Sequence, residues 1–371
     1  MSILTHQTRK EQAKNISQVF ASWCVKIKQL RPKEHKARIH NFAWLLTGIF
    51  LSKSVHLSRI ADKIPGEATA TSRERRLSRF LDNPAIRVRE WYGVIAKSIL
   101  ADAAQSVKEI RLIVDGTKIG FGHQLLMVSV AFRRRAIPLA WTWIRCSRGH
   151  SSGRKQLALL SYVRSLLPKR VPVLVVGDSE FGSVDVLKEL KRWRWNYVLR
   201  QKASHLIKQM GQKHWQRFGE VITKPGQSLW LGKSRLTHSH RFQTHLLAYW
   251  KVGEDEPWLL ATSLPTPQET LAAYRRRMWI EEMFGDLKKH GFDIEQTHLR
   301  HFMRLSRLTL AAALLYVWLV ALGSHVIKVG LRRFVDRADR RDLSIFRIGC
   351  RMIERRLANS LAFSITFMLY G

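Results

Sequence analysis

The sequence predicts an α/β protein in which an all-helical region precedes a sheet-containing core. In residues 1–105 apolar side chains recur at helical spacing, whereas from Ile110 onward short β-branched runs alternate with helical stretches. With 371 residues, the chain is long enough for two or three domains. We therefore expect a helical domain over residues 1–105 and a mixed-sheet core after it.

The helical region contains two segments that resemble a helix-turn-helix. HLSRIADKI and TSRERRLSRFLDN lie on either side of a turn at Pro65-Gly66. In the second segment we expect Thr71 to cap the helix. Its apolar residues are expected to pack inward: Leu77, Phe80 and Leu81. Three arginines are expected to face outward and contact DNA: Arg73, Arg76 and Arg79. The alternative is a solvated basic helix within a bundle.

The core is predicted from the order of its elements. IRLIVDG is a short strand that ends in an acid, and LLMVSVAF and AIPLAWTWI form a hairpin. A helix (QLALLSYVRSLL), a strand (VPVLVVGD), a helix (DVLKELKRW) and a strand (NYVLRQK) follow. This order predicts a mixed sheet. We interpret residues 106–202 as the first part of a ribonuclease H-like catalytic core.

The second part of the core follows an insertion. Over residues 203–257 the helical signal fades into short alternating pieces such as SLWLG and HLLAYWKV, which predicts a β-rich insertion. The strand PWLLATSL and a helix that begins near Gln268 resume the core over residues 258–330. Residues 331–371 are expected to form a C-terminal helical segment.

One stretch, LTLAAALLYVWLVAL at residues 308–322, is apolar enough to suggest a membrane helix. Its roughly 15 residues are fewer than the ~20 that a spanning helix needs. Arg304, Arg307 and Lys328 flank it. We predict a buried core helix and no membrane partner.

The charge balance indicates a polyanionic partner. Lys and Arg number 64 against 28 Asp and Glu, which gives a formal net charge of +36. The excess extends along the whole chain, and each cation placed against a phosphate releases condensed counterions. Nucleic acid is therefore the expected partner, with a membrane surface as the alternative that charge alone allows.

The cysteines and the N-terminus bear on location. Cys24, Cys146 and Cys350 are far apart and form no CxxC pair, which excludes a zinc ribbon and indicates a reducing compartment. The N-terminal residues lack the apolar segment of a secretory signal. We expect a cytoplasmic protein.

Two carboxylates mark the ends of predicted strands. Asp115 closes IRLIVDG and Asp178 closes VPVLVVGD, where the ends of sheet strands open onto a crevice. An aspartate beside glycine at a strand end is often only a turn residue. Two of them on neighbouring strands of one sheet point instead to a shared site.

The segment YRRRMWIEEMFGDLKKHG supplies a third carboxylate. On a regular helix Tyr274, Arg277, Glu281 and Lys288 fall within one arc of about 60°. An apolar stripe beside it is expected to hold the helix on the sheet: Ile280, Met283, Phe284 and Leu287. Glu282 and Asp286 are rival third carboxylates, but they lie off this arc. Without the strand-end aspartates, Arg277 and Glu281 would be read as a surface i,i+4 pair.

This spacing, Tyr274-x2-Arg277-x3-Glu281-x6-Lys288, resembles the Y-R-E-K signature of cut-and-paste insertion-sequence transposases of the bacterial DDE class. The resemblance extends over about residues 110–290, through Asp115 in VDGT, Asp178 in VGDSEFG, and the run YVLRQK. It implies Asp115, Asp178 and Glu281 as the catalytic and metal-binding acids. It also explains the about 100 residues between Asp178 and Glu281 as a β insertion.

Phosphodiester cleavage needs an activated water, stabilisation of charge on the phosphate, and help for the leaving 3′ oxygen. Two Mg²⁺ ions about 3.5–4 Å apart supply all three, and Mg²⁺ prefers hard oxygen ligands. We expect Asp115 to bridge both ions, Asp178 to bind one, and Glu281 to bind the other. Mn²⁺ is expected to substitute for Mg²⁺.

Several residues are assigned to DNA binding. Tyr274, Arg277 and Lys288 match the signature positions that hold phosphates near the cleaved end. Two further cations come from YVLRQK: Arg200 and Lys202. Trp258 lies in a W-L-L-x-T run in which, by the resemblance, a tryptophan stacks on a base flipped out of the duplex. The alternative is a core tryptophan on the sheet.

The function implied is that of a transposase that binds transposon ends, cleaves them and joins them to target DNA. Its partner is double-stranded DNA, both the inverted-repeat ends and the target, and it is expected to be a dimer on paired ends. The resemblance implies a hairpinned transposon end as an intermediate. Two alternatives stay open: a non-catalytic regulator derived from a transposase, and a junction nuclease on the same fold.

Overall fold

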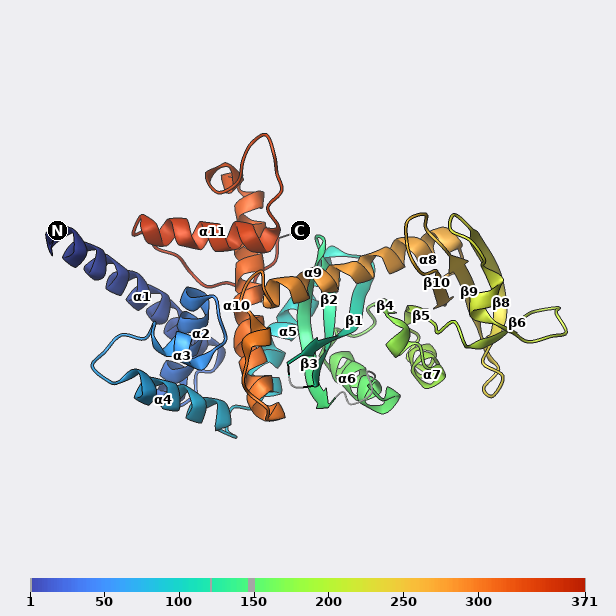
Figure 1. Cartoon of the computed structure of the whole chain (residues 1–371), viewed down its shortest axis with the longest axis horizontal. Helices are drawn as coiled ribbons and strands as arrows, with labels where there is room; N and C mark the ends of the chain where they lie inside the picture. Colours follow the sequence, from blue (N-terminus) through green and yellow to red (C-terminus); the bar gives the residue numbers. More distant parts are fainter. Residues whose placement is uncertain (1, 121, 146–150, 371) are drawn as a thin grey trace. The chain divides into compact units, whose positions relative to one another are not determined.

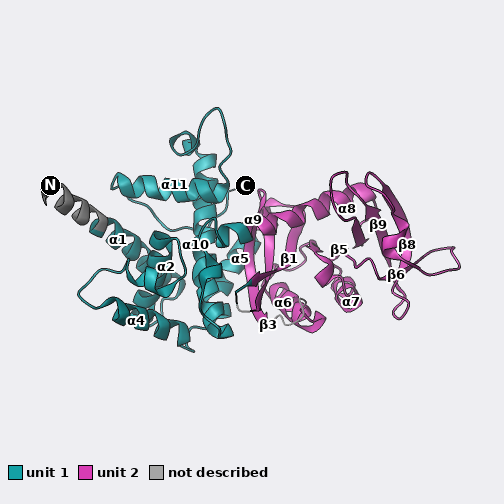
Figure 2. Cartoon of the chain, in the orientation of Figure 1, with its two compact units in different colours: residues 1–102, 119–121, 284–371 teal, residues 103–118, 122–283 magenta. Residues whose placement is uncertain are grey.

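The computed structural model describes residues 2–120, 122–145 and 151–370. The chain divides into two compact units (Figure 2). Unit 1 comprises residues 1–102, 119–121 and 284–371, and unit 2 comprises residues 103–118 and 122–283. Cys146 lies outside the described residues, and Cys24 and Cys350 are free thiols.

Unit 1 is a helical assembly (Figure 1). Its long helices and short helical turns are α1 (Ser2–Leu30), α2 (Lys36–Ser52), α3 (Leu57–Ala61), α4 (Ala70–Asp82), α5 (Val88–Ser106), η4 (Ile294–Gln296), α10 (Phe302–Lys328), η5 (Leu331–Phe334) and α11 (Ile345–Ala358). The α5 helix extends a few residues into unit 2. The expected apolar face of α2 is buried: Phe42, Leu45, Leu46 and Ile49.

The apolar stretch at residues 308–322 lies in α10, and all of its side chains are buried. By length and composition α10 is the one described helix that could cross a membrane, but 89% of its most apolar window is covered by protein. The prediction of a buried core helix is confirmed. Gly323 and Gly349 lie where α10 and α11 approach closely. A Cβ at Gly323 would come 1.9 Å from the backbone oxygen of Ile345 in α11, and a Cβ at Gly349 would come 1.9 Å from that of Leu319 in α10.

The helix pair around Pro65-Gly66 is present as α3 and α4, but its cap differs from the prediction. Thr69, not Thr71, is the N-cap of α4, because its side chain accepts a hydrogen bond from the backbone N–H of Ser72. The helix therefore begins one residue before Thr71, which lies in its first turn. The inward packing of Leu77, Phe80 and Leu81 is confirmed.

Unit 2 is built on one ten-stranded sheet with strand order β3-β2-β1-β4-β5-β10-β9-β8-β6-β7. The first five strands in the chain are β1 (Ile110–Ile119), β2 (His123–Phe132), β3 (Arg135–Arg145), β4 (Val173–Gly177) and β5 (Asn196–Arg200). Helices α6 (Gly153–Leu166) and α7 (Val184–Arg192) connect β3 to β4 and, after a short turn η1 (Ser179–Phe181), β4 to β5. The predicted order of elements is confirmed in this part of the chain.

The mixed character of the sheet follows from these connections. β1, β4 and β5 run parallel, with helical crossovers, whereas β2 and β3 form an antiparallel hairpin. At the hairpin turn Arg133 and Arg134 have φ of 43° and 64°. Two successive residues with positive φ match the twist of the flanking strands.

Residues 203–257 extend the same sheet. They form β6 (Leu206–Gln209), β7 (Gln216–Arg217), a short turn η2 (Phe218–Val221), β8 (Ser228–Leu236) and β9 (Phe242–Tyr249). β10 (Trp258–Thr262) joins this addition to the core, because it pairs antiparallel with both β5 and β9. The β-rich segment is therefore continuous with the core sheet.

The helix predicted to begin near Gln268 is interrupted. It consists of α8 (Pro267–Tyr274), a 3₁₀ turn η3 (Arg275–Arg277) and α9 (Met278–Leu287). The interruption corrects the assumption of a regular helix, because a 3₁₀ turn winds three residues per turn instead of 3.6. The apolar stripe is nevertheless buried as expected: Ile280, Met283, Phe284 and Leu287.

Candidate active site

Asp115 and Asp178 lie next to each other across two parallel strands. The pairing of β1 with β4 ends at Val114 and Gly177, so each aspartate is the next residue after the last matched pair. β1 itself continues to Ile119, and thus Asp115 lies at the end of the parallel pairing and not, as expected, at the end of the strand. Asp178 precedes the turn η1, where the chain leaves the sheet. Their placement follows from the strand register.

The Asp115 carboxylate is held by two donors. The backbone N–H of Gly116 donates to Oδ1 at 2.7 Å, and Nη1 of Arg277 donates to Oδ2 at 2.9 Å. Only 13% of the Asp115 side chain is exposed. Burial raises its pKa to about 7 against the opposing effect of Arg277 and the Gly116 amide, and the charges of Asp178 and Glu281 raise it further.

Arg277 connects the third carboxylate to the first. Its Nη2 donates to Oε1 of Glu281 at 2.5 Å while its Nη1 contacts Asp115. Arg277 is 13% exposed and Glu281 is 45% exposed. Because Arg277 also reaches a strand residue far away in the sequence, its contact with Glu281 is more than a surface pair along one helix. One guanidinium therefore joins two of the three predicted acids.

The rival carboxylates have other partners. Glu282 accepts a hydrogen bond from Nη1 of Arg135, at the start of β3, at 2.7 Å. Asp286 is buried and belongs to unit 1. Of the three acids on this helix, Glu281 is the one that is linked to Asp115 through Arg277.

The fit of a divalent cation can be judged from the donors. Oδ1 of Asp178 is buried and has no hydrogen-bond partner among the described residues, so it is an oxygen that a cation would satisfy. All three groups are carboxylates, the ligands that Mg²⁺ prefers. In the described part of the chain, however, no three acidic, histidine or cysteine side chains lie close enough together to hold an ion as they stand. The donors fit, and Arg277 occupies oxygens of two of them.

A polar network next to the aspartates was not predicted. Gln124 on β2 donates to Oε2 of Glu180 at 2.9 Å, and Ser151 donates its backbone N–H to Oε1 at 2.6 Å. Gln156 on α6 donates to the backbone oxygen of Glu180 at 2.9 Å. Gly116 leaves room for this crossing, since a Cβ there would lie 2.4 Å from Nε2 of Gln124. The network ties β2, beside Asp115, to the turn that follows Asp178.

Little in the sequence could have revealed this network. Glu180 lies in the run GDSEFG, two residues after Asp178. The one sequence feature that points to Glu180 is therefore its position close to a candidate catalytic aspartate. Gln124 and Gln156 are separated from it by tens of residues and follow no recognisable pattern. Their roles come from the sheet order and the helix crossover.

Three of the residues assigned to DNA binding lie around one another in unit 2. Tyr274 is buried, and burial raises the pKa of its hydroxyl while Arg277 opposes this effect. The half-buried ring of Trp258 packs edge-on against Tyr274, with centroids 5.0 Å apart. Arg200 donates to Oε2 of Glu256 at 2.9 Å and to the backbone oxygen of Pro257. Lys202 follows β5 and is exposed.

Lys288, the last residue of the signature, lies in unit 1. Its Nζ contacts Oε1 of Glu295 at 2.9 Å. It follows the end of α9 and its backbone N–H donates to the oxygen of Phe284 at 2.9 Å. The structure therefore brings Arg277 to the acids of unit 2 and places Lys288 in an ion pair of its own.

The N-terminal arginines line a cavity of about 520 Å³ in unit 1, between α2 and α4. Arg73 does not simply face outward as expected. It is half-buried and donates to the backbone oxygens of Ala61 and Gly66, which fixes the turn between α3 and α4. Arg76 is half-buried and Arg79 is exposed. Arg38 of α2 completes the basic lining.

Comparisons with known proteins add the family. Residues 108–318, more than half of the chain, match the family model described as "Transposase DDE domain". No curated protein sequence matches the chain. Among solved structures, the chain is similar to the piggyBac transposase in a cryo-EM structure of its synaptic complex with hairpin DNA. That similarity has a TM-score of 0.40 and 10% sequence identity, and covers 94% of this chain and 78% of the other.

Proposed function

Because the chain belongs to the family of proteins with a transposase DDE domain, we propose that it is an active transposase that cleaves transposon ends and joins them to target DNA. The observation that carries the proposal is that the strand register brings two aspartates together within the region that matches the family. Asp115 and Asp178 are adjacent at the end of the β1–β4 pairing, and Arg277 links Asp115 to Glu281. The finer assignment is a bacterial insertion-sequence enzyme of the Y-R-E-K type.

We assign the core of unit 2 to the ribonuclease H-like class. The strand order β3-β2-β1-β4-β5, with β1, β4 and β5 parallel and the β2–β3 hairpin antiparallel, supports this assignment. In such an arrangement the carboxyl ends of the parallel strands open onto the site. The β-rich addition between the second and third acids agrees with the insertion that the family resemblance implies.

The residues that would hold divalent ions are Asp115, Asp178 and Glu281. Two Mg²⁺ ions, or Mn²⁺ in their place, would supply charge neutralisation at the phosphate and at the attacking and leaving oxygens. The buried and unsatisfied Oδ1 of Asp178 and the hard carboxylate oxygens support this cofactor.

The chain's own contribution to the reaction is position and charge. The Gly116 amide holds the Asp115 carboxylate in a fixed orientation. The Gln124–Glu180 contact holds the turn after Asp178 against β2. Arg277 carries a planar guanidinium that suits bidentate contact with a phosphate of the cleaved strand. Lys288 of unit 1, which is paired with Glu295, is kept as a candidate phosphate contact.

DNA binding is assigned to both units. The net charge of +36 and the arginine-lined cavity at α4 support a backbone contact in unit 1, and Arg200, Lys202, Tyr274 and Trp258 support one in unit 2. The partners are the inverted-repeat ends and the target, held by a dimer. A cytoplasmic location, at the nucleoid when bound, completes the proposal.

The decisive experiment supplies pre-cut transposon ends, taken from the DNA that flanks the gene, together with a plasmid target and Mg²⁺. A transposase joins the 3′ ends to the plasmid, and gel analysis detects the joined product. A junction nuclease would cut branched DNA in the same buffer without joining. A regulator would bind the ends and do neither, so either of these results would overturn the proposal.

A further inference from the structure

Arg277 is bound to the very oxygens that a divalent cation at this site needs. Its two terminal nitrogens occupy Oδ2 of Asp115 and Oε1 of Glu281, at 2.9 and 2.5 Å. An ion held by the same carboxylates would sit about 2.0–2.1 Å from its oxygen ligands. A guanidinium and a divalent ion cannot share those oxygens in such geometry without strong repulsion.

The assignment of these acids as metal ligands is the proposed function, and this inference rests on it. We infer that Arg277 is an internal counter-cation that competes with the metal ions, and that metal binding displaces its guanidinium from Asp115 and Glu281. Once displaced, the guanidinium remains in the site with its donors unoccupied. It is then available to the phosphate of the bound strand, which couples DNA binding to metal loading.

The surroundings of Arg277 support an exchange. Arg277 lies in the short 3₁₀ turn η3, between α8 and α9, where the chain does not form a regular helix. Glu281 is 45% exposed, so its side chain has room to turn toward an ion. The buried Asp178 Oδ1 has no partner among the described residues and offers a first ligand that Arg277 does not cover.

The chain contains a matched control. Arg135 makes a contact of the same kind with Glu282, the neighbour of Glu281, at 2.7 Å, and its side chain is 11% exposed. Removal of Arg135 therefore deletes a similarly buried charge from the same unit without freeing a predicted metal ligand. The comparison of Arg277 with Arg135 separates competition for ligands from a general change in charge.

The test measures metal affinity without DNA. Mg²⁺ and Mn²⁺ are titrated by calorimetry into the full chain and into Arg277→Met and Arg135→Met. We expect Arg277→Met to bind the ions at least ten-fold more tightly than the native chain, and Arg135→Met to differ less than two-fold. If Arg277→Met binds metal no better than the native chain, or more weakly, Arg277 does not compete and the inference is wrong.

Two further variants keep the outcome decisive. Arg277→Lys keeps a charge but has no fork to span two carboxylates, and it should bind metal with an affinity between those of the native chain and Arg277→Met. It stands in for Arg277→Met if the latter does not fold. Asp115→Asn should abolish binding in every background. If neither the native chain nor Arg277→Met binds the ions, the proposed function fails as well. This result differs from metal binding that is unchanged by Arg277→Met, which contradicts the inference alone.

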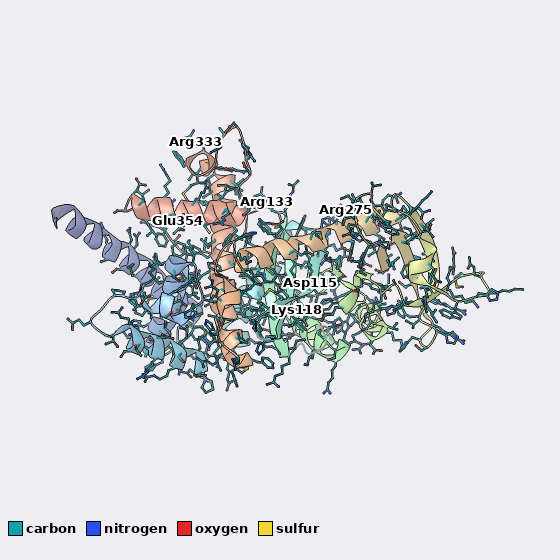
Figure 3. All side chains as sticks on the ribbon, viewed as in Figure 1. Asp115, Lys118, Arg133, Arg275, Arg333 and Glu354 are labelled. Carbon is teal, nitrogen blue, oxygen red and sulfur yellow. The ribbon has the colours of Figure 1, made fainter. Side chains whose placement is uncertain are left out.

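A second, independent observation concerns residues beyond the family match. A cavity of about 370 Å³ in unit 1 is lined by four arginines around Phe334 of η5. Phe334 is 44% exposed, and the guanidiniums of Arg333 and Arg355 each lie 5.1 Å from its ring centroid. Figure 3 labels Arg333 in this segment.

The positive charge of this cavity is not neutralised from within. Asp336, its one acid, is engaged by Arg332, whose Nη2 lies 2.5 Å from Oδ2. Arg333, Arg337 and Arg355 form no ion pair with the described residues. Guanidiniums suit bidentate phosphate contact, and an exposed ring beside them suits a sugar or base.

We propose that this cavity binds the phosphate backbone of DNA as a site separate from the acids of unit 2. The choice of DNA over other polyanions rests on the proposed function. The probe is a 40-base-pair duplex of arbitrary sequence, and its affinity for the full chain without divalent metal is measured by fluorescence anisotropy over a range of salt concentrations. The test variant is Arg333→Ala with Arg337→Ala.

The matched control is Arg340→Ala in the same segment, because Arg340 is exposed but paired with Asp342 at 2.8 Å. We expect the double variant to bind at least five-fold more weakly, with a salt slope smaller by about two, and the control to match the native chain. An unchanged affinity would overturn the proposal, as would lost binding to phosphatidylglycerol vesicles with DNA binding intact. If the native chain binds no DNA, the proposed function fails too.

Discussion

The candidate active site of unit 2 and the arginine-lined cavity at α4 in unit 1 both contain several arginines, but the partners of these arginines differ. In unit 2 the arginines of and around the candidate active site pair with acids: Arg277 with Asp115 and Glu281, Arg135 with Glu282, and Arg200 with Glu256. In the cavity at α4, Arg73 donates to backbone oxygens. Among the described residues that line this cavity, Arg38 is the one arginine in an ion pair, which it forms with Glu34.

This difference indicates two uses of the same residue type. A guanidinium bound to a carboxylate has its charge neutralised, and it becomes available to a phosphate only when the carboxylate takes another cation. A guanidinium held by carbonyl oxygens keeps its full charge while its position is fixed. The cavity at α4 is therefore suited to bind DNA without metal, whereas under the proposed function Arg277 contacts a phosphate only after divalent ions bind its carboxylate partners.

The sharpest test of the comparison removes the acids. Asp115→Asn, Asp178→Asn and Glu281→Gln should each reduce Mg²⁺-dependent cleavage by roughly 10³-fold or more, because each removes one of the three proposed metal-binding carboxylates. Duplex binding without metal should stay intact. Cleavage of labelled ends and anisotropy measure the two.

Glu282→Gln is the control for this set, because Glu282 pairs with Arg135 and, among the described residues, makes no contact that leads to Asp115. It should cleave at nearly the native rate. If Glu282→Gln abolishes cleavage and Glu281→Gln does not, the assignment of the third carboxylate is wrong.

The dependence of duplex affinity on ionic strength tests whether the arginine-lined cavity at α4 contacts the DNA backbone. If several phosphates are neutralised, duplex affinity should fall by roughly 10³-fold between about 50 and 200 mM salt. Anisotropy titrations without divalent metal measure this slope. An affinity that stays constant over the range would exclude an extensive contact with the DNA backbone.

The pH dependence of Mg²⁺ affinity tests the candidate active site of unit 2. The pKa of Asp115, raised by burial to about 7 from an ordinary 3.8, means that the carboxyl keeps its proton below pH 7, whereas a metal ligand must be ionised. Mg²⁺ affinity should therefore fall by up to roughly ten-fold for each pH unit below 7. Calorimetry from pH 5 to 8 measures it, and a flat profile would contradict the raised pKa.

The same shift predicts the stability of the chain without divalent ions. Between about pH 4 and 7 the folded state holds a proton at Asp115 that the unfolded state releases. A rising pH therefore lowers the free energy of unfolding over this range, and Asp115→Asn should remove that part of the slope. Denaturant titrations at several pH values measure it.

Substitution of Trp258 tests whether its ring, which packs against Tyr274, has a structural role or contacts DNA. As a stacking surface for a flipped base it would contribute about 1–3 kcal/mol, so Trp258→Ala should slow second-strand cleavage of nicked ends by roughly ten-fold and leave first nicking unchanged. An abasic nucleotide at the flipped position should restore the rate.

Trp230→Ala is the matched control, because Trp230 is a half-buried tryptophan on β8 of the same sheet that packs on His245. It should leave both steps unchanged. If Trp258→Ala slows nicking and second-strand cleavage equally, or unfolds the chain, Trp258 is a core residue.

The sequence predicted the parts that depend on local pattern. Alternation of strands and helices predicted the order from β1 to β5, and the apolar run at residues 308–322 predicted the buried helix α10. Strand-end aspartates and the Tyr274-to-Lys288 spacing selected the acids whose geometry is described above. These features are short in sequence, so a local pattern marks them, although the helix that carries the Tyr274-to-Lys288 spacing is interrupted at η3.

What the sequence could not supply depends on contacts between distant segments. The break at Arg275–Arg277 carries no glycine or proline, and it comes with the Arg277 contact to a strand about 160 residues earlier. The Gln124–Glu180 contact needs β2 and β4 to flank β1. The shift of the α4 cap from Thr71 to Thr69 reflects two threonines with similar capping ability, between which the preceding turn decides.

The smallest expected effect separates two arginines within one cavity. Arg73 donates to the backbone oxygens of Ala61 and Gly66, so Arg73→Ala should lower the free energy of unfolding by about 0.5–1.5 kcal/mol as these hydrogen bonds are lost. Arg79 is exposed, and Arg79→Ala should leave stability unchanged, weaken duplex binding a few-fold and reduce the salt slope by about one. Urea titrations of both variants show which arginine stabilises the turn, and anisotropy shows which one contributes to duplex binding. If Arg79→Ala destabilises the chain while Arg73→Ala weakens binding without loss of stability, the two roles are reversed and α4 presents a different face to DNA.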